Sequence, residues 1–208
     1  TLSLNSLGAA TGTSVFTDSI TLGNGTNVVS DVGSLTSTVA NSAVNITTGT
    51  GANTITLGAF ATNNVTFGAH SASVSDTVNV AGAGVGVTAI APTANVTGFN
   101  DNGADKIVFA GDALAAGNLT AFTAAQITTA LNGTSATLAN VVNALFTTGA
   151  VAQHTVGEFV YQGNTYVVEH AGATNAAFAA GDTLVQLMGQ HTLTGASTVA
   201  AGALTLHG

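Results

Sequence analysis

The chain lacks cysteine and tryptophan, and it contains one proline and a single basic residue, Lys106. Without cysteine there are no disulfide bonds and no thiol chemistry, which excludes a disulfide-stapled scaffold and a cysteine-dependent enzyme. Nine acidic residues against one lysine give a formal net charge of −8. A chain that cannot neutralise phosphate groups is not expected to bind nucleic acid or anionic lipid surfaces.

Charge of either sign is scarce, because charged residues make up only 5% of the sequence, whereas about 25% is typical of globular domains. Such a surface lacks the repulsion that keeps monomers apart. Two interpretations stay open: a neutral monomer covered by Thr and Asn, or a subunit whose surface is covered by its neighbours. Polar residues interrupt every apolar run well before the roughly 20 residues of a membrane span, so we expect no membrane insertion.

Strand-forming residues dominate what is present. Residues 20–98 are one block rich in Thr, Val, Asn, Gly and Ala; Val, Ile and Thr favour strands, and Gly marks corners. In the N-terminal half we expect strands at Thr1–Asn5, Asn27–Val32, Val44–Thr47, Thr54–Leu57, Asn64–Phe67, Thr77–Val80 and Gly86–Ile90.

The second half changes character twice. Residues 123–147 space their apolar side chains as a helix does, with a break at Asn132-Gly133 and a cap at Thr134 or Ser135. A hairpin is expected around residues 162–164, because strand-like sequence flanks Gln-Gly-Asn there. The remaining strands are expected at Asp182–Met188 and Ala203–His207.

Two glycine-rich segments, Thr21–Val29 and Ile46–Leu57, share one pattern in which alternate positions are Gly, Gly, Asn and an aliphatic residue. This is the rhythm of one turn of a parallel β-roll. At such a corner we expect a positive φ at Gly49 or Gly51, which glycine tolerates. The sequence thus predicts a mostly-β protein: an irregular β-roll or β-sandwich with one short helical insertion and a C-terminal β unit.

This fold divides into two predicted regions. Residues 1–95 are expected to form the degenerate Gly/Asn/Thr-rich β-roll or β-sandwich, and residues 96–208 to hold a calcium loop, the helical insertion and the C-terminal β unit. Threonine pairs along the strands share no constant spacing, so we expect no regular threonine ladder of the kind found on flat β-solenoids.

Oxygen-bearing side chains are densest in the loop between residues 100 and 105. Calcium takes six to eight oxygen ligands, so this loop needs help from elsewhere in the chain. The alternative is a simple turn in which Asn and Asp bond their own backbone. The predicted calcium ligands are Asp101, Asn102, Asp105 and Asp112, with Asp76, Asn53 and Asn27 as weaker candidates in the glycine-rich turns.

Catalytic patterns are missing from the sequence. It has no Gly-x-Ser-x-Gly elbow, phosphate loop, dinucleotide fingerprint or His-Glu-x-x-His motif. Five histidines are present without i, i+4 spacing, which favours packed or solvated roles over a transition-metal site. We therefore expect that the protein is not an enzyme.

The glycine repeats, the stretch Val96–Phe109 and the pair Gly163–Val168 and Ala180–Leu187 together resemble the calcium-binding repeats-in-toxin family. Within that family they resemble the bacterial surface-layer proteins exported by type I secretion. The resemblance implies a self-assembling structural protein on the bacterial cell surface, with calcium-ordered loops, a homopolymeric state and cell-surface polysaccharide as a further partner. The alternative is an adhesion or biofilm-matrix module of a larger secreted protein. Both glycine repeats carry Asn where the family has Asp.

The first five residues are the expected assembly segment. Leu2 and Leu4 alternate with small polar residues, and no charge or proline blunts the strand edge. Such a strand can add to the sheet of a neighbouring subunit by β-augmentation, or it can pair within its own chain. The sequence leaves these two alternatives open.

Overall fold

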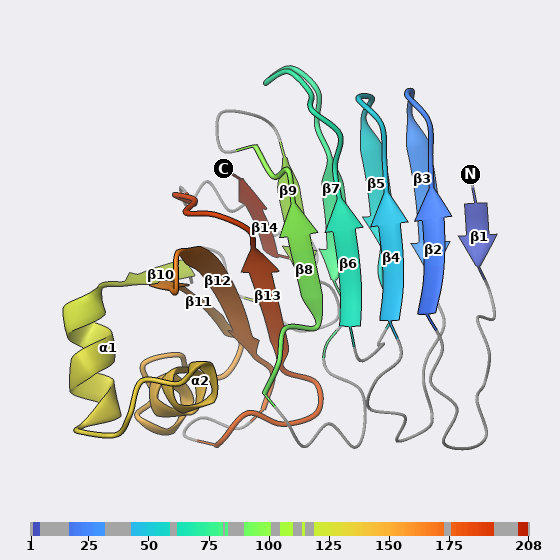
Figure 1. The fold of residues 1–208 in the computed structure, drawn as a ribbon. Helices are drawn as coiled ribbons and strands as arrows, with labels where there is room; N and C mark the ends of the chain where they lie inside the picture. Colours follow the sequence, from blue (N-terminus) through green and yellow to red (C-terminus); the bar gives the residue numbers. More distant parts are fainter. Residues whose placement is uncertain are drawn as a thin grey trace.

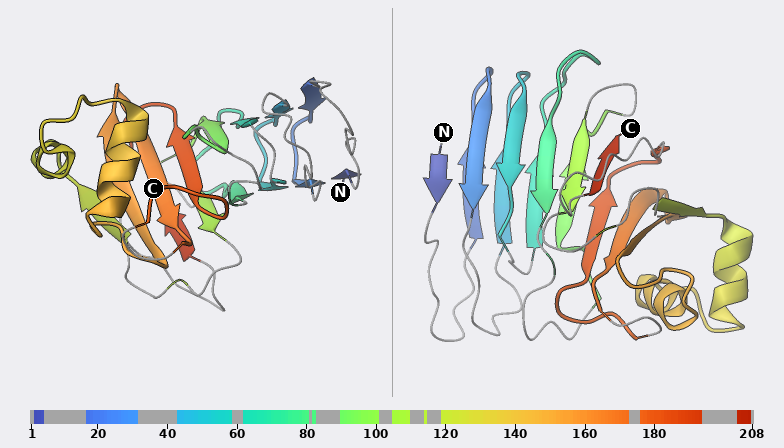
Figure 2. Two further views of the ribbon diagram at one scale, coloured as in Figure 1. Left: turned by 90° about the horizontal axis from the view of Figure 1, so that it is seen from below. Right: turned by 180° about the vertical axis from the view of Figure 1, so that it is seen from behind.

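The computed structural model describes residues 2–4, 17–31, 43–58, 62–80, 82, 90–100, 105–109, 114, 119–172, 176–193 and 204–207. Within these ranges the protein is mostly β, as the composition predicts, with fourteen strands and two helices. Two sheets pack face to face, and the helices lie at one end of them (Figures 1 and 2). None of the described helices is both long and apolar enough to span a membrane.

The chain alternates between the two sheets as far as β9. The six-stranded sheet holds, in spatial order, β1 (Leu2–Leu4), β3 (Asn27–Asp31), β5 (Asn53–Thr56), β7 (Thr77–Val80), β9 (Lys106–Phe109) and β14 (Leu204–His207). In the eight-stranded sheet β2 (Thr17–Thr21) is an edge strand. It is followed inward by β4 (Ala43–Thr47), β6 (Thr62–Thr66) and β8 (Ala94–Thr97). Neighbours among β1 to β9 are parallel in both sheets, so each even–odd pair of strands makes one coil stacked on the last.

Aliphatic rows between the sheets hold the coils together. Side chains alternate between the two faces of a strand, and in β4, β5, β6 and β7 every second residue is buried. The register aligns these residues from coil to coil, for example Ile46 with Val65 and Val65 with Val96. Burying one such side chain contributes about 1.5–3 kcal/mol, so each added coil extends one continuous core.

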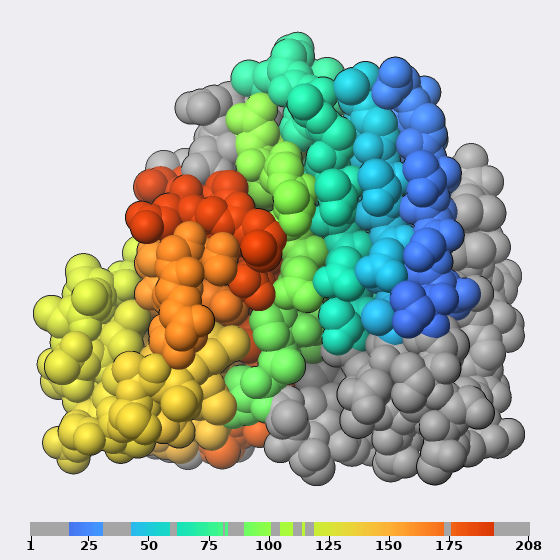
Figure 3. All heavy atoms as spheres, in the orientation of Figure 1, coloured from blue at the N-terminus to red at the C-terminus, as the bar shows by residue number. Residues whose placement is uncertain are grey.

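Figure 3 shows the outer face of the eight-stranded sheet, with the segments of β2, β4, β6 and β8 side by side. This face carries two polar ladders. Asn64 donates to Asn45 and Asn95 donates to Asn64, each across 2.8 Å. Two residues further along, exposed threonines stand opposite one another in the row Thr21, Thr47, Thr66 and Thr97. The sequence spacing gave no sign of this single row of threonines, because loops of unequal length separate the strands that carry it.

A C-terminal unit extends the eight-stranded sheet beyond β8. In spatial order it adds β13 (Thr183–Leu187), β12 (Asn164–His170), β11 (Thr155–Tyr161) and β10 (Leu119–Phe122). Helices α1 (Ala124–Leu131) and α2 (Leu138–Thr147) pack on its outer face through a second core that includes Val142, Phe146, Phe159 and Leu184. The predicted helical segment is thus two helices.

The break between these helices falls at Asn132-Gly133 as predicted, with Asn132 in the left-handed region. The N-cap of α2 is Thr137, whose side chain accepts from the backbone N–H of Asn140. The prediction of Thr134 or Ser135 as the cap is wrong. The helix begins later because Thr137 is the residue whose side-chain oxygen reaches a free N–H of its first turn.

Most of the predicted strands are present within a residue or two, and the turn of the expected hairpin is formed by Gln162 and Gly163, both with positive φ. The strands β2 and β10 were not expected, and most of Gly86–Ile90 lies outside the described residues. The proposed boundary between residues 95 and 96 falls inside β8. The main core includes residues from both sides of it, and the division into two regions stays a prediction.

The glycines of the second repeat are needed for a reason other than the one expected. Neither Gly49 nor Gly51 has a positive φ; in the first repeat Gly25 does, at 119°. A Cβ on Gly49 would lie 2.6 Å from Asn24 N, and one on Gly51 would lie 2.7 Å from Gly25 Cα. The backbones of adjacent corners therefore touch, and the missing side chain allows the coils to stack.

This close approach predicts that Gly51→Ala lowers the free energy of unfolding by about 1–3 kcal/mol, as overpacking does. The matched control is Gly23→Ala in the preceding corner, where an added Cβ meets nothing within 4 Å. The control should change stability by less than about 0.5 kcal/mol. Urea unfolding of both variants measures the difference, and equal midpoints would contradict the close stacking of the corners.

Candidate functional site

Four Asn and Asp side chains stack at the end of the coils where the chain passes from the eight-stranded to the six-stranded sheet. They are Asn27, Asn53, Asp76 and Asp105, one from each successive corner, and we call them the Asx ladder. Each rung bonds to the next: Asn27 Nδ2 donates to Asn53 Oδ1 (2.7 Å), and Asn53 Nδ2 donates to Asp76 Oδ1 (2.9 Å). The backbone N–H of Asp76 then donates to Asp105 Oδ1 (2.8 Å).

The two asparagines also satisfy the backbone of their own corners. Asn27 Nδ2 donates to the carbonyl oxygens of Gly23 (3.0 Å) and Gly25 (3.1 Å). Asn53 Nδ2 repeats the pattern with the carbonyls of Gly49 and Gly51. In each of these two corners the amide nitrogen lies within hydrogen-bonding distance of two carbonyl oxygens and of a side-chain oxygen of the next rung. A bound cation could also neutralise such a group of oxygens.

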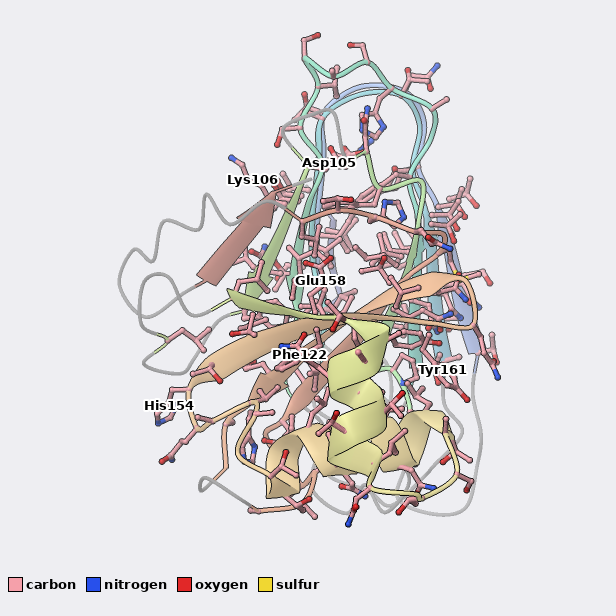
Figure 4. The ribbon with its side chains drawn as sticks, turned by 90° about the vertical axis from the view of Figure 1, so that its left-hand side faces the viewer. Asp105, Lys106, Phe122, His154, Glu158 and Tyr161 are labelled. Carbon is pink, nitrogen blue, oxygen red and sulfur yellow. The ribbon has the colours of Figure 1, made fainter. Side chains whose placement is uncertain are left out.

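At the third corner His70 takes over the role of this amide. Its Nδ1 lies 2.8 Å from the Gly68 carbonyl, and its Nε2 lies 3.1 Å from both carboxylate oxygens of Asp105. Asp76 Oδ2 is 3.4 Å from Nδ1. The His70 side chain is only 2% exposed, and both carboxylates are fully buried. Asp105 lies in the upper half of Figure 4, below the loops at the top of the view.

Both ring nitrogens of His70 face oxygen acceptors, so only the doubly protonated imidazolium can donate to both. Burial by itself would lower the pKa of His70, but the Gly68 carbonyl and the charges of Asp105 and Asp76 outweigh it, and the pKa is raised. Burial raises the pKa of Asp76, against the hydrogen bonds from Asn53 that lower it. The two facing acceptors and the raised pKa of His70 thus favour a protonated ring beside Asp76 and Asp105.

Of the residues predicted as calcium ligands, the structure brings four together in the Asx ladder. Asp101, Asn102 and Asp112 lie outside the described residues. The ligand atoms of His70, Asp76 and Asp105 lie within 4.8 Å of one another and could hold a metal ion. One nitrogen and two carboxylates are not the oxygen-rich shell that calcium prefers, and calcium binding stays a prediction.

The sequence analysis missed His70. The first two corners follow a short Gly-x-Gly-x-Asn pattern, whereas the third runs from Gly68 to Asp76 without a second glycine or an asparagine. This longer corner leaves room for a side chain to fold back over the ladder. The third corner contains a histidine and no asparagine, and this difference is the sequence feature that could have identified His70.

A second buried histidine holds the C-terminal unit. His170 Nδ1 lies 3.0 Å from Asp182 Oδ1, and the ring stacks on Phe146 with centroids 4.0 Å apart. Asp182 also accepts from the backbone N–H groups of Ala171 (2.8 Å) and Ala179 (2.6 Å). Its carboxylate thus joins the loops that follow β12 and precede β13, which is a structural role.

Two buried glutamates lie on the inner face of the same unit. Glu158 and Glu169 stand opposite Val167 and Val156, so they are diagonal neighbours on β11 and β12. Glu158 Oε1 accepts from the backbone N–H of Leu193 across 3.5 Å, and the residue, labelled near the middle of Figure 4, is 7% exposed. Both glutamates are therefore packed in the interior.

The His70 cluster predicts a pH-dependent stability in the presence of a chelator. Because the folded pKa of His70 lies above the unfolded value of 6.5, its stabilisation is complete below about pH 6.5 and is lost as the pH rises through the folded pKa. The raised pKa of Asp76 acts in the same direction. Replacing the ring by His70→Gln should therefore cost about 1.5–3 kcal/mol near pH 6 and less at alkaline pH, above the folded pKa of His70.

Urea unfolding across this pH range provides the measurement. The control is His154→Asn, which lies far from the ladder (Figure 4) and keeps a residue that tolerates the positive φ of 57° at this position. A loss of stability in His70→Gln that is the same at both pH values would contradict the charged state of the ring.

The chain matches no protein-family model, no curated protein and no solved structure. Its site is therefore defined by its own geometry: a stack of corners in which asparagine amides and one histidine ring satisfy the oxygens of adjacent coils.

Proposed function

We propose that the protein is an irregular β-roll that assembles through the open end of its coils, as a subunit of an extracellular array or filament. The observation that carries this proposal is the difference between the two ends of the stack. At one end β10 to β13 and the two helices extend and cover the sheets; at the other end β1 and β2 are the terminal strands (Figure 1). Repeat proteins need a polar cap at each end to remain soluble.

One edge of β2 pairs with none of the strands that the structure describes, and such an edge is suited to strand addition. Leu22 N donates to Thr47 O across 2.8 Å, and alternate residues of a strand face opposite neighbours, so the N–H of Ser19 points away from β4. No described strand pairs with this side of β2. The strand contains neither lysine nor proline, the residues that most often protect a free edge.

The N-terminal segment contributes to the same end. β1 is parallel to β3, with Leu2 opposite Val29, and it is the terminal strand of its sheet. β1 pairs with β3 along one of its edges, so its other edge can still pair with a strand of a neighbouring subunit. We propose that Leu2 and Leu4 belong to the contact between subunits.

Location and ligands follow from the resemblance to exported repeats-in-toxin proteins. We place the protein on the bacterial cell surface, with calcium ordering the loop around Asp101 and with cell-surface polysaccharide as a further partner. The alternative is an adhesion or matrix module, in which further coils of a larger protein cover the open end. The scarcity of charge supports either form, since both cover the neutral surface.

Blocking the β2 edge should abolish assembly. Ser19→Pro removes the outward N–H while β2 keeps its bonds to β4, and proline is accepted at strand edges. We expect the variant to remain monomeric with a melting temperature near that of the parent. Ser19→Thr, which keeps the N–H, should assemble normally, and deletion of residues 1–5 should also prevent assembly.

Electron microscopy and light scattering, with and without calcium, measure the outcome. Polymers of both Ser19→Pro and the truncated protein would show that the open end is not the connector. A parent protein that stays monomeric under all conditions would favour the module of a larger protein.

A further inference from the structure

We infer that His70, Asp76 and Asp105 form a binding site for a divalent transition-metal ion of the zinc class. Three side chains from two consecutive corners supply one imidazole nitrogen and two carboxylates, with ligand atoms within 4.8 Å of one another. This donor set suits zinc and its neighbours, which accept nitrogen and oxygen ligands together. The inference does not depend on how the chain assembles.

Hydrogen bonds from neighbouring groups fix the orientation of the three side chains, as they commonly do for the ligands of a metal ion. His70 Nδ1 lies 2.8 Å from the Gly68 carbonyl, and such a bond fixes the tautomer that leaves Nε2 for a metal. Asp105 is held by the backbone N–H groups of Asp76 (2.8 Å) and Asn100 (2.9 Å). The backbone N–H and the side-chain amide of Asn53 both donate to Asp76 Oδ1, so neither of them reaches Oδ2.

The second oxygen of Asp76 points to a missing ligand. Asp76 Oδ2 is fully buried and accepts no hydrogen bond from any residue that the structure describes. Leaving a buried carboxylate oxygen without a donor is costly, and His70 Nδ1 at 3.4 Å already serves Gly68. A cation between the two carboxylates would satisfy this oxygen.

Distances and charge are compatible with exchange of a proton for a metal. Metal–ligand distances near 2.0–2.1 Å put the ligands of a tetrahedral zinc site about 3.4 Å apart, and Nε2 is 3.1 Å from both oxygens of Asp105. The ligand atoms of all three residues lie within 4.8 Å of one another. With both carboxylates ionised and His70 neutral, the three residues carry a charge of about −2, which a divalent ion balances.

The test is titration of the full chain with zinc chloride in a non-chelating buffer, followed by calorimetry. We expect one zinc ion per chain and proton release that follows the ionisation enthalpy of the buffer. His70→Gln and Asp76→Asn should each weaken binding by at least about 100-fold, with circular dichroism confirming that they fold. His154→Asn is the control for adventitious binding by other histidines, and it should bind as the parent does.

Two further readouts separate the site from its alternatives. Cobalt(II) added to the parent should give the visible absorption of a four-coordinate nitrogen–oxygen site, and His70→Gln should not show it. Zinc at about 100 times its dissociation constant should stabilise the parent against urea, and excess calcium should not displace it. The inference is overturned if the parent binds no zinc, if Asp76→Asn binds with unchanged affinity, or if calcium competes equally.

Discussion

Coil-to-coil register is the constraint on which the rest of the structure depends. Parallel pairing of β2 to β9 places each inward aliphatic residue over the one below, and Ile55, Val78 and Ile107 form one such continuous row. The same register aligns polar residues that would otherwise be scattered: the Asx ladder inside one set of corners, and the asparagine and threonine ladders on the outer face. A slip of one residue would turn every one of these side chains to the wrong face.

When the corners stack, their carbonyl and carboxylate oxygens are buried and need hydrogen-bond donors, which side chains of the same chain supply. Carbonyls from adjacent corners converge, and a buried carbonyl or carboxylate without a donor is costly. Asn27 and Asn53 supply amide hydrogens, and His70 places its two ring nitrogens within hydrogen-bonding distance of the Gly68 carbonyl and the Asp105 carboxylate. In a chain with one lysine, a protonated histidine is the positive group available to the buried carboxylates, and it is also the group that a metal ion would displace.

The elements whose signals lie close together in the sequence could be predicted. Alternating β-branched residues predicted β4, β5, β6 and β7, and helical spacing predicted α1 and α2, because these signals lie within a few neighbouring residues. Asn27, Asn53, Asp76 and Asp105 were predicted as calcium ligands rather than as members of a hydrogen-bonded ladder. The partner His70 and the threonine row were not predicted, since loops of unequal length hide their alignment and only the pairing register reveals it. The reason for glycine at position 51 is likewise a contact between coils rather than a local angle.

The central claim is that a charged His70 ring completes the Asx ladder. Nitrogen-15 NMR of the histidine rings in metal-free protein at neutral pH tests it most directly, because it reports the protonation of each ring nitrogen. The account predicts that His70 has protons on both Nδ1 and Nε2, protected from exchange with solvent, and that zinc removes the proton on Nε2 alone. A neutral His70 ring that exchanges rapidly and titrates like a solvated histidine would contradict it.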